Sequence, residues 1–314
     1  MHPVRRLLLA ASENAWMRAN ATRLPVFRRA VTRFMPGERL EDALGAAQTL
    51  RQQDGIAVIL TRLGENVTEP AGADAVAAHY LDANDHIEQR QLDAQLSVKL
   101  TQLGLDVDPV RCREHVTRLA ERAGRRGAML WIDMEQHRYV DATLALYHEV
   151  VTAHRNVGVC LQSYLHRTAG DLQDVIGAGG AVRLVKGAYR EPASVAHPRK
   201  IDVDASYLAL ARTMVDAARQ ANGFRAVFGT HDVTLIDAIQ QYARATGSAQ
   251  QACEFALLYG IKRGVQQHLS RDGYRVRVLI SYGEAWFPWY MRRLAERPAN
   301  ILFVARAMMS RAGH

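Results

Sequence analysis

Eight short segments rich in β-branched and apolar residues recur along this chain, and longer segments of helical periodicity separate them. The predicted strands are Ile56–Leu63, Leu96–Leu100, Met129–Met134, Val157–Leu161, Val182–Val185, Ala226–Gly229, Glu254–Leu258 and Val276–Ile280. Helical segments between them include Asp74–Gln91, Val110–Arg122, Val140–His154, Ala205–Ala221 and Val233–Arg244. Strands that alternate with helices pair in parallel through right-handed crossovers. Eight such units in about 260 residues match an α/β protein of the (βα)8 TIM-barrel type better than an open doubly wound sheet.

The region before the first predicted strand has a different character. We assign residues 1–45 to an N-terminal helical arm and residues 46–314 to the barrel domain. The first forty residues hold eight arginines among Leu, Val, Phe and Trp. Such a basic amphipathic arm could make peripheral contact with a membrane surface, or it could pack against the barrel. The sequence has no apolar segment near the roughly 18 residues that span a bilayer.

Composition narrows the class of protein. The formal net charge is +8, but the charge is dispersed and no basic run is interleaved with aromatic residues, so we expect no nucleic-acid binding. Three widely separated cysteines suit neither a disulfide framework nor a zinc site. The apolar run at the N-terminus is too short for a signal peptide. We expect a cytoplasmic protein, with peripheral contact at the inner face of the membrane left open.

A (βα)8 barrel carries its active site at the carboxyl ends of its strands, and two ionisable residues lie there. Alternation along Ser97-Val98-Lys99-Leu100-Thr101 puts Lys99 on the face opposite Val98 and Leu100. A buried lysine is costly unless it is paired, and Asp133 at the end of the next strand is its natural partner. The pair could be structural, catalytic or both.

The fifth predicted strand ends in Arg183-Leu184-Val185-Lys186-Gly187, which brings two cations and a permissive glycine to one strand end. This combination suits a negative, planar ligand. The chain has no Gly-x-Gly-x-x-Gly after a strand and no phosphate-binding Gly-Lys-Ser/Thr loop, so a nucleotide cofactor would bind outside the Rossmann mode. The histidines show no metal-ligand spacing, and His231 is a strand-end candidate for contact with a cofactor.

Adjacent arginines occur near the C-terminus, in Trp289-Tyr290-Met291-Arg292-Arg293-Leu294-Ala295-Glu296-Arg297-Pro298. Two guanidinium groups can hold a small carboxylate through parallel charge-assisted hydrogen bonds. Arg292 and Glu296 are four residues apart on one helical face, so the glutamate could orient the arginine. An ordinary solvent-exposed ion pair is the alternative.

Together these motifs resemble the proline dehydrogenase family. The matching segments are Ser-Val-Lys-Leu-Thr at 97–101, Ile-Asp-Met-Glu at 132–135, Gln-Ser-Tyr-Leu at 162–165, Arg-Leu-Val-Lys-Gly-Ala-Tyr at 183–189, Thr-His at 230–231 and Arg-Arg-Leu-Ala-Glu-Arg-Pro-Ala-Asn at 292–300. The resemblance implies a distorted (βα)8 barrel that binds FAD and oxidises L-proline to Δ1-pyrroline-5-carboxylate. It also implies that electrons pass to an acceptor such as a membrane quinone.

The resemblance carries residue roles with it. It implies catalytic roles for Asp133 and Arg183, with Arg183 near flavin N5. It implies that Lys99, Asp133, Tyr282, Arg292 and Arg293 bind the substrate. The implied cofactor contacts are Met134, Gln162, Arg183, Val185, Lys186, Gly187, Ala188, Thr230, His231 and Glu296. Glu65, after the first strand, resembles a gate partner of Arg292.

Two departures from the family pattern concern the substrate. The family usually has Tyr-x-Pro-aromatic-Gly after strand 8, whereas this chain has Leu279-Ile280-Ser281-Tyr282-Gly283, and Trp289 replaces a common tyrosine. Pocket changes of this size shift substrate preference by roughly 1–3 kcal/mol. Proline is the expected substrate, and hydroxyproline or another cyclic imino acid is an alternative. A non-redox aldolase that uses Lys99 or Lys186 as a Schiff-base nucleophile is a further alternative.

Overall fold

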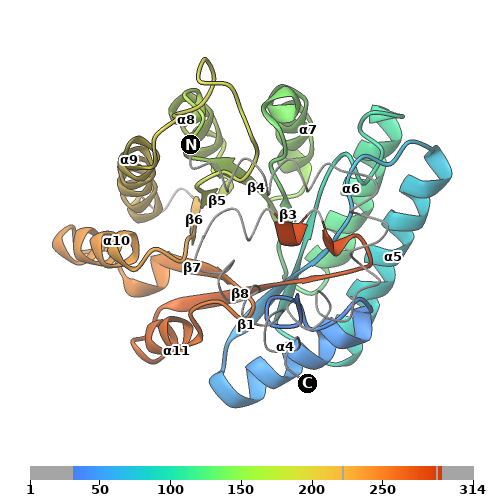
Figure 1. The fold of residues 1–314 in the computed structure, drawn as a ribbon, viewed down its shortest axis with the longest axis horizontal. Coiled ribbons are helices and arrows are strands. Elements are labelled where there is room, and N and C mark those ends of the chain that lie inside the picture. The colour runs from blue at the N-terminus through green and yellow to red at the C-terminus, as the bar shows by residue number, and fades with distance from the viewer. Residues whose placement is uncertain (1–30, 221–222, 288, 292–314) are drawn as a thin grey trace, which may run out of the picture.

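The computed structural model describes residues 31–220, 223–287 and 289–291, and they form a closed barrel of eight parallel strands (Figure 1). The strands follow one another around the barrel in chain order, and β1 closes it by pairing with β8. They are β1 (Ala57–Arg62), β2 (Ala94–Val98), β3 (Leu130–Ile132), β4 (Val157–Gln162), β5 (Ala181–Val185), β6 (Arg225–Gly229), β7 (Cys253–Leu258) and β8 (Arg275–Tyr282). The predicted fold class is therefore confirmed.

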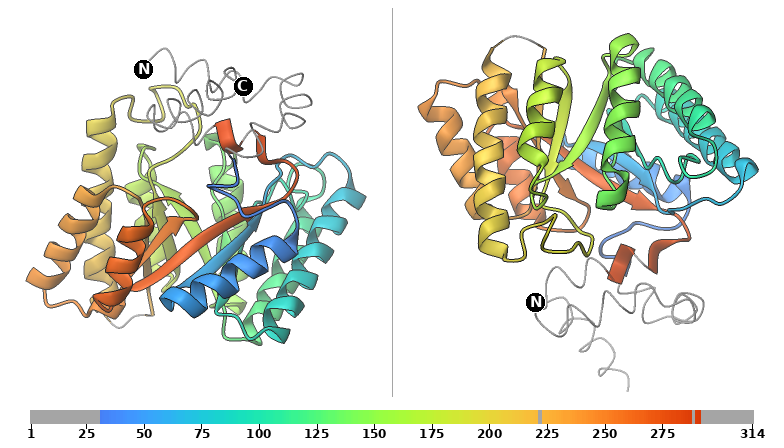
Figure 2. Two further views of the ribbon diagram at one scale, coloured as in Figure 1. Left: turned by 60° about the horizontal axis from the view of Figure 1, so that its bottom comes forward. Right: turned by 90° about the horizontal axis from the view of Figure 1, so that it is seen from above.

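Helices surround the strands on the outside of the barrel (Figure 2). They are α4 (Leu40–Asp54), α5 (Pro70–Gln89), α6 (Pro109–Gly124), α7 (Val140–Ala153), α8 (Thr168–Gly177), α9 (Lys200–Arg219), α10 (Val233–Ala245) and α11 (Arg263–Arg271), with short 3-10 turns η1 (His137–Tyr139) and η2 (Gln250–Ala252). The α4 helix runs across the boundary expected between arm and barrel at residues 45 and 46, and it packs on β1 and β8. Residues 1–30 of the predicted arm lie outside the described part of the chain.

Local sequence signals set several helix ends. Pro70 and Pro109 occupy the first turns of α5 and α6, where a missing N–H costs nothing. Asp108 caps α6 by accepting a hydrogen bond from the Arg111 backbone N–H at 3.0 Å. Gly55 ends α4 in the left-handed conformation, with φ of 64°. These caps fix where each helix leaves the strand before it or meets the strand after it.

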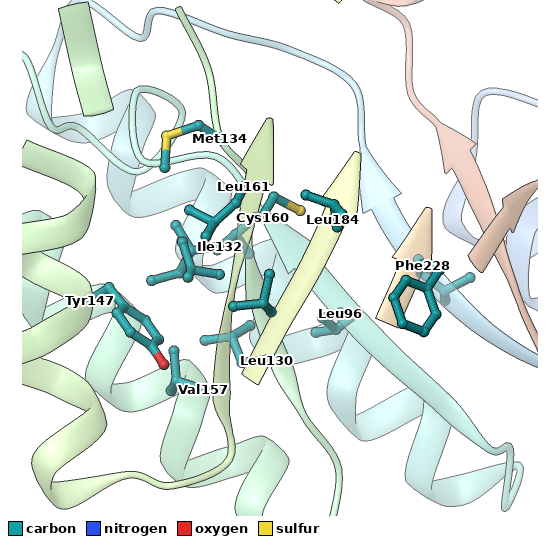
Figure 3. Close-up of a cluster of buried hydrophobic side chains, with 14 of the residues drawn as sticks. Leu96, Leu130, Ile132, Met134, Tyr147, Val157, Cys160, Leu161, Leu184 and Phe228 are labelled. Atoms are coloured by element: carbon teal, nitrogen blue, oxygen red, sulfur yellow. The ribbon is translucent and has the colours of Figure 1, made fainter. Parts of the chain in front are cut away.

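The larger hydrophobic core lies between the strands and the helices. Leu130 and Ile132 of β3 are fully buried on the outward face of the barrel, together with Val157 of β4. Tyr147 of α7 is turned toward these strand residues (Figure 3). Full burial of each such side chain contributes roughly 1.5–3 kcal/mol, so this layer anchors each helix to the sheet.

A second, smaller cluster fills the inside of the barrel near the amino ends of the strands. It comprises Ile59, Met129, Trp131, Ala181, Val227 and Ala256, with Leu279 packed against it. Glu254 of β7 pairs there with Arg225 of β6 and Arg277 of β8. The amino-end half of the barrel interior is thus filled. The other ionisable residues of the interior lie at the carboxyl ends of the strands.

None of the helices within the described ranges is both long and apolar enough to cross a membrane.

Candidate functional site

The predicted pair of Lys99 and Asp133 is present inside the barrel. Lys99 follows the last residue of β2, and its Nζ lies 3.4 Å from Oδ2 of Asp133, which follows β3. Ser97, two residues earlier on the same face of β2, donates its hydroxyl to Asp133 Oδ1 at 2.7 Å. Alternation along β2 thus puts two side chains on one carboxylate.

Arg183 of β5 joins the same carboxylate from the other side. One Nη of its guanidinium forms an ion pair with Asp133 and also donates to the Ser97 hydroxyl at 2.8 Å. Its Nε lies 2.9 Å from the sulfur of Cys160, the residue that pairs with Arg183 in the β4–β5 register. With an exposure of 3%, Arg183 is removed from solvent and its direction is fixed.

Charge pairing determines the protonation states in this network. Burial opposes the charge of Asp133, yet Lys99 and Arg183 outweigh it and lower its pKa below the ordinary value. Burial likewise opposes the charge of Lys99, and the carboxylates of Asp133 and Glu65 raise its pKa. Burial, with a further contribution from the Asp133 carboxylate, raises the pKa of the Cys160 thiol to about 12 despite the nearby guanidinium. At neutral pH the group is therefore two cations, one carboxylate and a neutral thiol.

A tryptophan supports the guanidinium from the amino-end side. The guanidinium carbon of Arg183 lies 5.3 Å from the centroid of the Trp131 ring, within the range of a cation–π contact. Trp131 donates its indole N–H to Gln95 at 2.7 Å, which fixes the ring. Gly158 makes room for it, because a Cβ at that position would come within 2.5 Å of the indole. The floor under Arg183 is thus built from three strands.

Buried polar atoms beside this network have no partner among the described residues. They are Nη1 of Arg183 and Oε1 of Gln162, the last residue of β4. The amide nitrogen of Gln162 donates to the Met134 carbonyl at 3.3 Å, which fixes the orientation of the side chain and leaves its oxygen as the unpaired atom. An unsatisfied buried donor and acceptor each cost free energy, and a polar ligand at the carboxyl ends of β4 and β5 would satisfy both.

The chain turns sharply at the end of β5. Gly187 has φ of 110°, and a Cβ there would come within 2.2 Å of the Tyr164 ring. Val185 ends the strand, and Ala188 continues the turn. Gly229 at the end of the neighbouring β6 is similarly close to Val185 and the Leu184 carbonyl. Both positions therefore require glycine, because neighbouring protein atoms occupy the space that a Cβ would take.

Other predicted cofactor residues lie just after β5 and β6 and have partners of their own. Lys186 extends away from the Arg183 network and pairs with Asp204 of α9 at 2.5 Å and Asp232 at 2.9 Å. The two cations of this strand end therefore do not converge on one site. Thr230 is buried and accepts from the Asp232 backbone N–H at 3.1 Å. His231 accepts from the Leu258 backbone N–H through Nε2 at 2.8 Å, which leaves the ring proton of the neutral tautomer on Nδ1.

The predicted gate residue, Glu65, lies close to Lys99. Glu65 follows β1 and contributes to the raised pKa of Lys99, as a nearby carboxylate does. Its Oε1 accepts a hydrogen bond from the Tyr189 hydroxyl at 3.3 Å. Tyr189 belongs to the loop after β5, so this contact links the exits of two strands that are distant in sequence.

Tyr282, a predicted substrate residue, is not brought into this group. It is 1% exposed within the outer core, and its hydroxyl lies 2.9 Å from Nε2 of His79 in α5. Alternation along β8 explains this placement, because Leu279 and Ser281 take the inward positions. Trp289 is buried in a separate cluster with Phe34 and Leu63. Arg292, Arg293 and Glu296 lie outside the described residues.

Several side chains of the site were missed in the sequence analysis. Ser97 shares the face of Lys99 on β2, but no pattern in the sequence indicates that it bridges Asp133 and Arg183. Cys160 and Trp131 look like ordinary core residues in their strands, and only strand register shows that they face Arg183. Glu135 was part of a quoted motif, and its pairing with Thr101 gave no local signal.

Comparison with known proteins identifies the family of the chain. Residues 43–306 match the family description "Proline dehydrogenase". The chain is 36% identical to a proline dehydrogenase of Deinococcus radiodurans over 88% of its length and 89% of the relative's. It is 34% identical to proline dehydrogenase 2 of Bacillus subtilis strain 168, over 90% of this chain and 91% of that protein.

Solved structures share the fold at lower identity. The structure of proline utilization A from Bdellovibrio bacteriovorus, inactivated by N-propargylglycine, matches with a TM-score of 0.79 and 19% identity over 93% of this chain and 38% of that one. A proline utilization A structure from Bradyrhizobium japonicum matches with a TM-score of 0.73 and 22% identity, over 89% of this chain and 32% of that one. The present chain thus spans about a third of these larger proteins. Its match to the family over most of its length shows that it belongs to the proline dehydrogenase family.

Proposed function

We propose that this protein oxidises L-proline to Δ1-pyrroline-5-carboxylate with FAD as its cofactor. The observation that carries the proposal is the buried group of Lys99, Asp133 and Arg183 at the carboxyl ends of β2, β3 and β5, in a chain of the proline dehydrogenase family. When bound, FAD would supply the electron acceptor for a hydride from the ring carbon next to nitrogen, and the secondary amine would lose a proton.

The residues at the carboxyl ends of the strands fit such a cofactor. The unsatisfied Nη1 of Arg183 and Oε1 of Gln162 offer one donor and one acceptor to the polar edge of a flat ring. Gly187, packed against the Tyr164 ring, lies in the turn after β5 and is part of the proposed cofactor set. Met134, Val185, Lys186, Ala188, Thr230, His231 and Glu296 complete the proposed cofactor set. The guanidinium of Arg183 places positive charge where a reduced ring would develop negative charge.

Lys99 and the paired arginines hold the substrate in this proposal. The raised pKa of Lys99 keeps it cationic, so it can bind the proline carboxylate while Asp133 neutralises the remaining charge. Arg292 and Arg293 supply the bidentate part of the clamp. Glu65 closes over the substrate as the gate partner of Arg292. Holding the ring in one pose supplies much of the rate acceleration.

The pairing of the lysines argues against the Schiff-base alternative. A nucleophilic lysine must be neutral, and it is activated by a lowered pKa. The pKa of Lys99 is instead raised, because the carboxylates of Asp133 and Glu65 outweigh burial. Lys186 is held between two aspartates as an ion pair. Redox chemistry therefore fits these side chains better than imine formation.

A related substrate is the second candidate, and Leu279 is the observation that favours it. Its side chain packs against the cluster inside the barrel, at the position where the family usually has tyrosine. The shorter, apolar side chain changes the room and the polarity beneath the substrate ring. Hydroxyproline or another cyclic imino acid is the alternative that this change supports.

The electron acceptor and the location of the enzyme complete the proposal. A membrane quinone is the acceptor we propose, and it would give the arginine-rich arm a role in peripheral contact with the inner face of the membrane. The remainder of the protein would then lie in the cytoplasm. Co-sedimentation with anionic vesicles, with and without residues 1–30, tests this part.

The purified protein tests the proposed activity. We expect yellow protein with flavin absorbance that turns over L-proline with a dye acceptor, and a panel with hydroxyproline and ring-size analogues ranks the substrates. Arg292→Ala and Arg293→Ala should each raise the KM for proline while the flavin stays bound. Protein that is colourless and cannot be reconstituted with FAD would overturn the proposal, and an unchanged KM would reject the clamp.

A further inference from the structure

A second buried carboxylate lies two residues after Asp133, and the proposed substrate and cofactor sets do not use it. Glu135 is 4% exposed. Its Oε1 accepts a hydrogen bond from the Thr101 backbone N–H at 3.1 Å, and its Oε2 accepts from the Thr101 hydroxyl at 2.6 Å. Both oxygens of Glu135 are therefore directed to a single residue just beyond β2.

Thr101 in turn is hydrogen-bonded to the segment that follows β1. Its hydroxyl accepts from the Asn66 backbone N–H at 3.2 Å, and its carbonyl accepts from the Val67 backbone N–H at 3.0 Å. Asn66 has φ of 55°, a left-handed conformation that needs support from its surroundings. The hydroxyl of Tyr139, which donates to Asp106 at 2.7 Å, lies 3.4 Å from the Asn66 side-chain oxygen. Thr101 therefore supplies the hydrogen bonds that hold the backbone of the segment.

The residue directly before Asn66 is Glu65, whose carboxylate lies near Lys99 and accepts from Tyr189. A shift of the Asn66 backbone would move Glu65 relative to both. We propose that Glu135 is a positioning residue that holds, through Thr101, the Glu65 segment in place beside the substrate-binding Lys99. This inference rests on the proposed function, since that function makes Glu65 the gate over the substrate.

Protonation of Glu135 would weaken this hold. Burial raises its pKa to about 7, with Glu65 adding to the rise while Thr101 and Lys99 oppose it. The groups that face it are Lys99 after β2, Glu65 after β1, Cys112 of α6 and Tyr139 of η1. On protonation both hydrogen bonds lose their charge assistance, and the oxygen that carries the proton no longer accepts from the Thr101 hydroxyl. The gate segment should therefore loosen as the pH falls through about 7.

Glu135→Gln copies the protonated state at constant size. We expect it to raise the KM for L-proline about tenfold at pH 8, roughly the worth of one charge-assisted hydrogen bond, with kcat within about twofold. The KM of the unmodified enzyme should rise toward that of the variant as the pH falls from about 8 to 6. Thr101→Val should act in the same direction, and Thr101→Ser, which keeps the hydroxyl, should restore the low KM.

Amide hydrogen exchange measures, independently of catalysis, whether the segment at Asn66 and Val67 is held in place. In the FAD-loaded protein, Glu135→Gln and Thr101→Val should speed amide exchange at Asn66 and Val67, while the strands stay protected. Glu149→Gln is the matched control, because that glutamate pairs with Arg113 on the outer faces of α7 and α6. It should change neither exchange nor KM.

The two hypotheses fail in different ways. If the unmodified enzyme does not oxidise proline, the proposed function fails, and exchange at Asn66 and Val67 still decides whether Glu135 holds the segment. If the enzyme oxidises proline but Glu135→Gln leaves the KM, its pH dependence and the exchange unchanged, the positioning role is overturned. Slower exchange in Glu135→Gln would overturn it as well.

Discussion

The two ends of the barrel interior contain similar ionic groups in different surroundings. At the amino ends of the strands, Glu254 lies between Arg225 and Arg277. At the carboxyl ends, Asp133 lies between Lys99 and Arg183. Each is one carboxylate between two cations. The comparison shows that buried charge alone does not mark an active site.

Their neighbours separate the two groups. Glu254 is 2% exposed and lies at the end that the apolar cluster of Trp131 and Ile59 fills. Asp133 is 18% exposed and lies where the strands end in turns, at the end where a (βα)8 barrel carries its active site. We infer that the amino-end group serves folding and that the carboxyl-end group serves chemistry. Four substitutions test this division.

Asp133→Ala should give the largest effect. It leaves Lys99 and Arg183 without their shared carboxylate, so both cations lose the group that positions them at the proposed substrate and cofactor site. We expect kcat/KM for proline to fall by about 10²–10³-fold or more. Steady-state kinetics on flavin-loaded protein measures this, and a loss below about threefold would break the proposed division.

Glu254→Ala is the matched change at the other end. Arg225 and Arg277 lose the carboxylate between them, and removal of one partner of a buried pair costs roughly 3–5 kcal/mol. We expect a large drop in the free energy of unfolding, measured by urea denaturation, with kcat/KM per folded molecule nearly unchanged. Equal loss of activity in the two variants would show that the two ends act as one unit.

Gly158→Ala tests the boundary between the two halves. The new methyl group would meet the Trp131 ring, which lies under the Arg183 guanidinium. Overpacking of this kind costs roughly 1–3 kcal/mol. We expect a moderate loss of stability together with a fall in kcat of about tenfold, from a displaced Arg183. If melting falls and kcat is unchanged, Trp131 supports the fold and not the guanidinium.

Leu279→Tyr should have the smallest effect. The residue packs at the edge of the amino-end cluster, and tyrosine is the side chain that the family usually has there. We expect the preference for proline over hydroxyproline to change by about tenfold, within the range for a small change in a pocket. The ratio of the two kcat/KM values measures it. A constant ratio would remove Leu279 from the substrate pocket.

Much of the fold was predictable because hydrophobic periodicity is local. Each predicted strand overlaps an observed one, although β2 ends at Val98 and not at Leu100, because the chain turns after Lys99. The Lys99–Asp133 pair was predictable as well, since alternation gives the face and chain order gives the neighbouring strand. The outward direction of Tyr282 follows from the same alternation, since it has the parity of Val276, Val278 and Ile280, whereas its substrate role came only from the family resemblance.

Contacts between sequence-distant elements account for the rest. Lys186 pairs with Asp204 and Asp232, which are 18 and 46 residues away on elements that only the closed barrel brings together. Glu135 and Thr101 meet across 34 residues at the exits of neighbouring strands. No periodicity marks such pairs, because each depends on how two loops pack.

Anaerobic stopped-flow reduction of the bound flavin by L-proline tests the central claim most directly. Parallel runs would compare the unmodified enzyme, Asp133→Ala and Glu254→Ala, each loaded with FAD and shown to be folded. We expect the unmodified enzyme and Glu254→Ala to bleach at similar rates and Asp133→Ala to be slower by about 10²–10³-fold. Bleaching of Asp133→Ala at the unmodified rate, or no bleaching of the unmodified enzyme at saturating proline, would contradict the account.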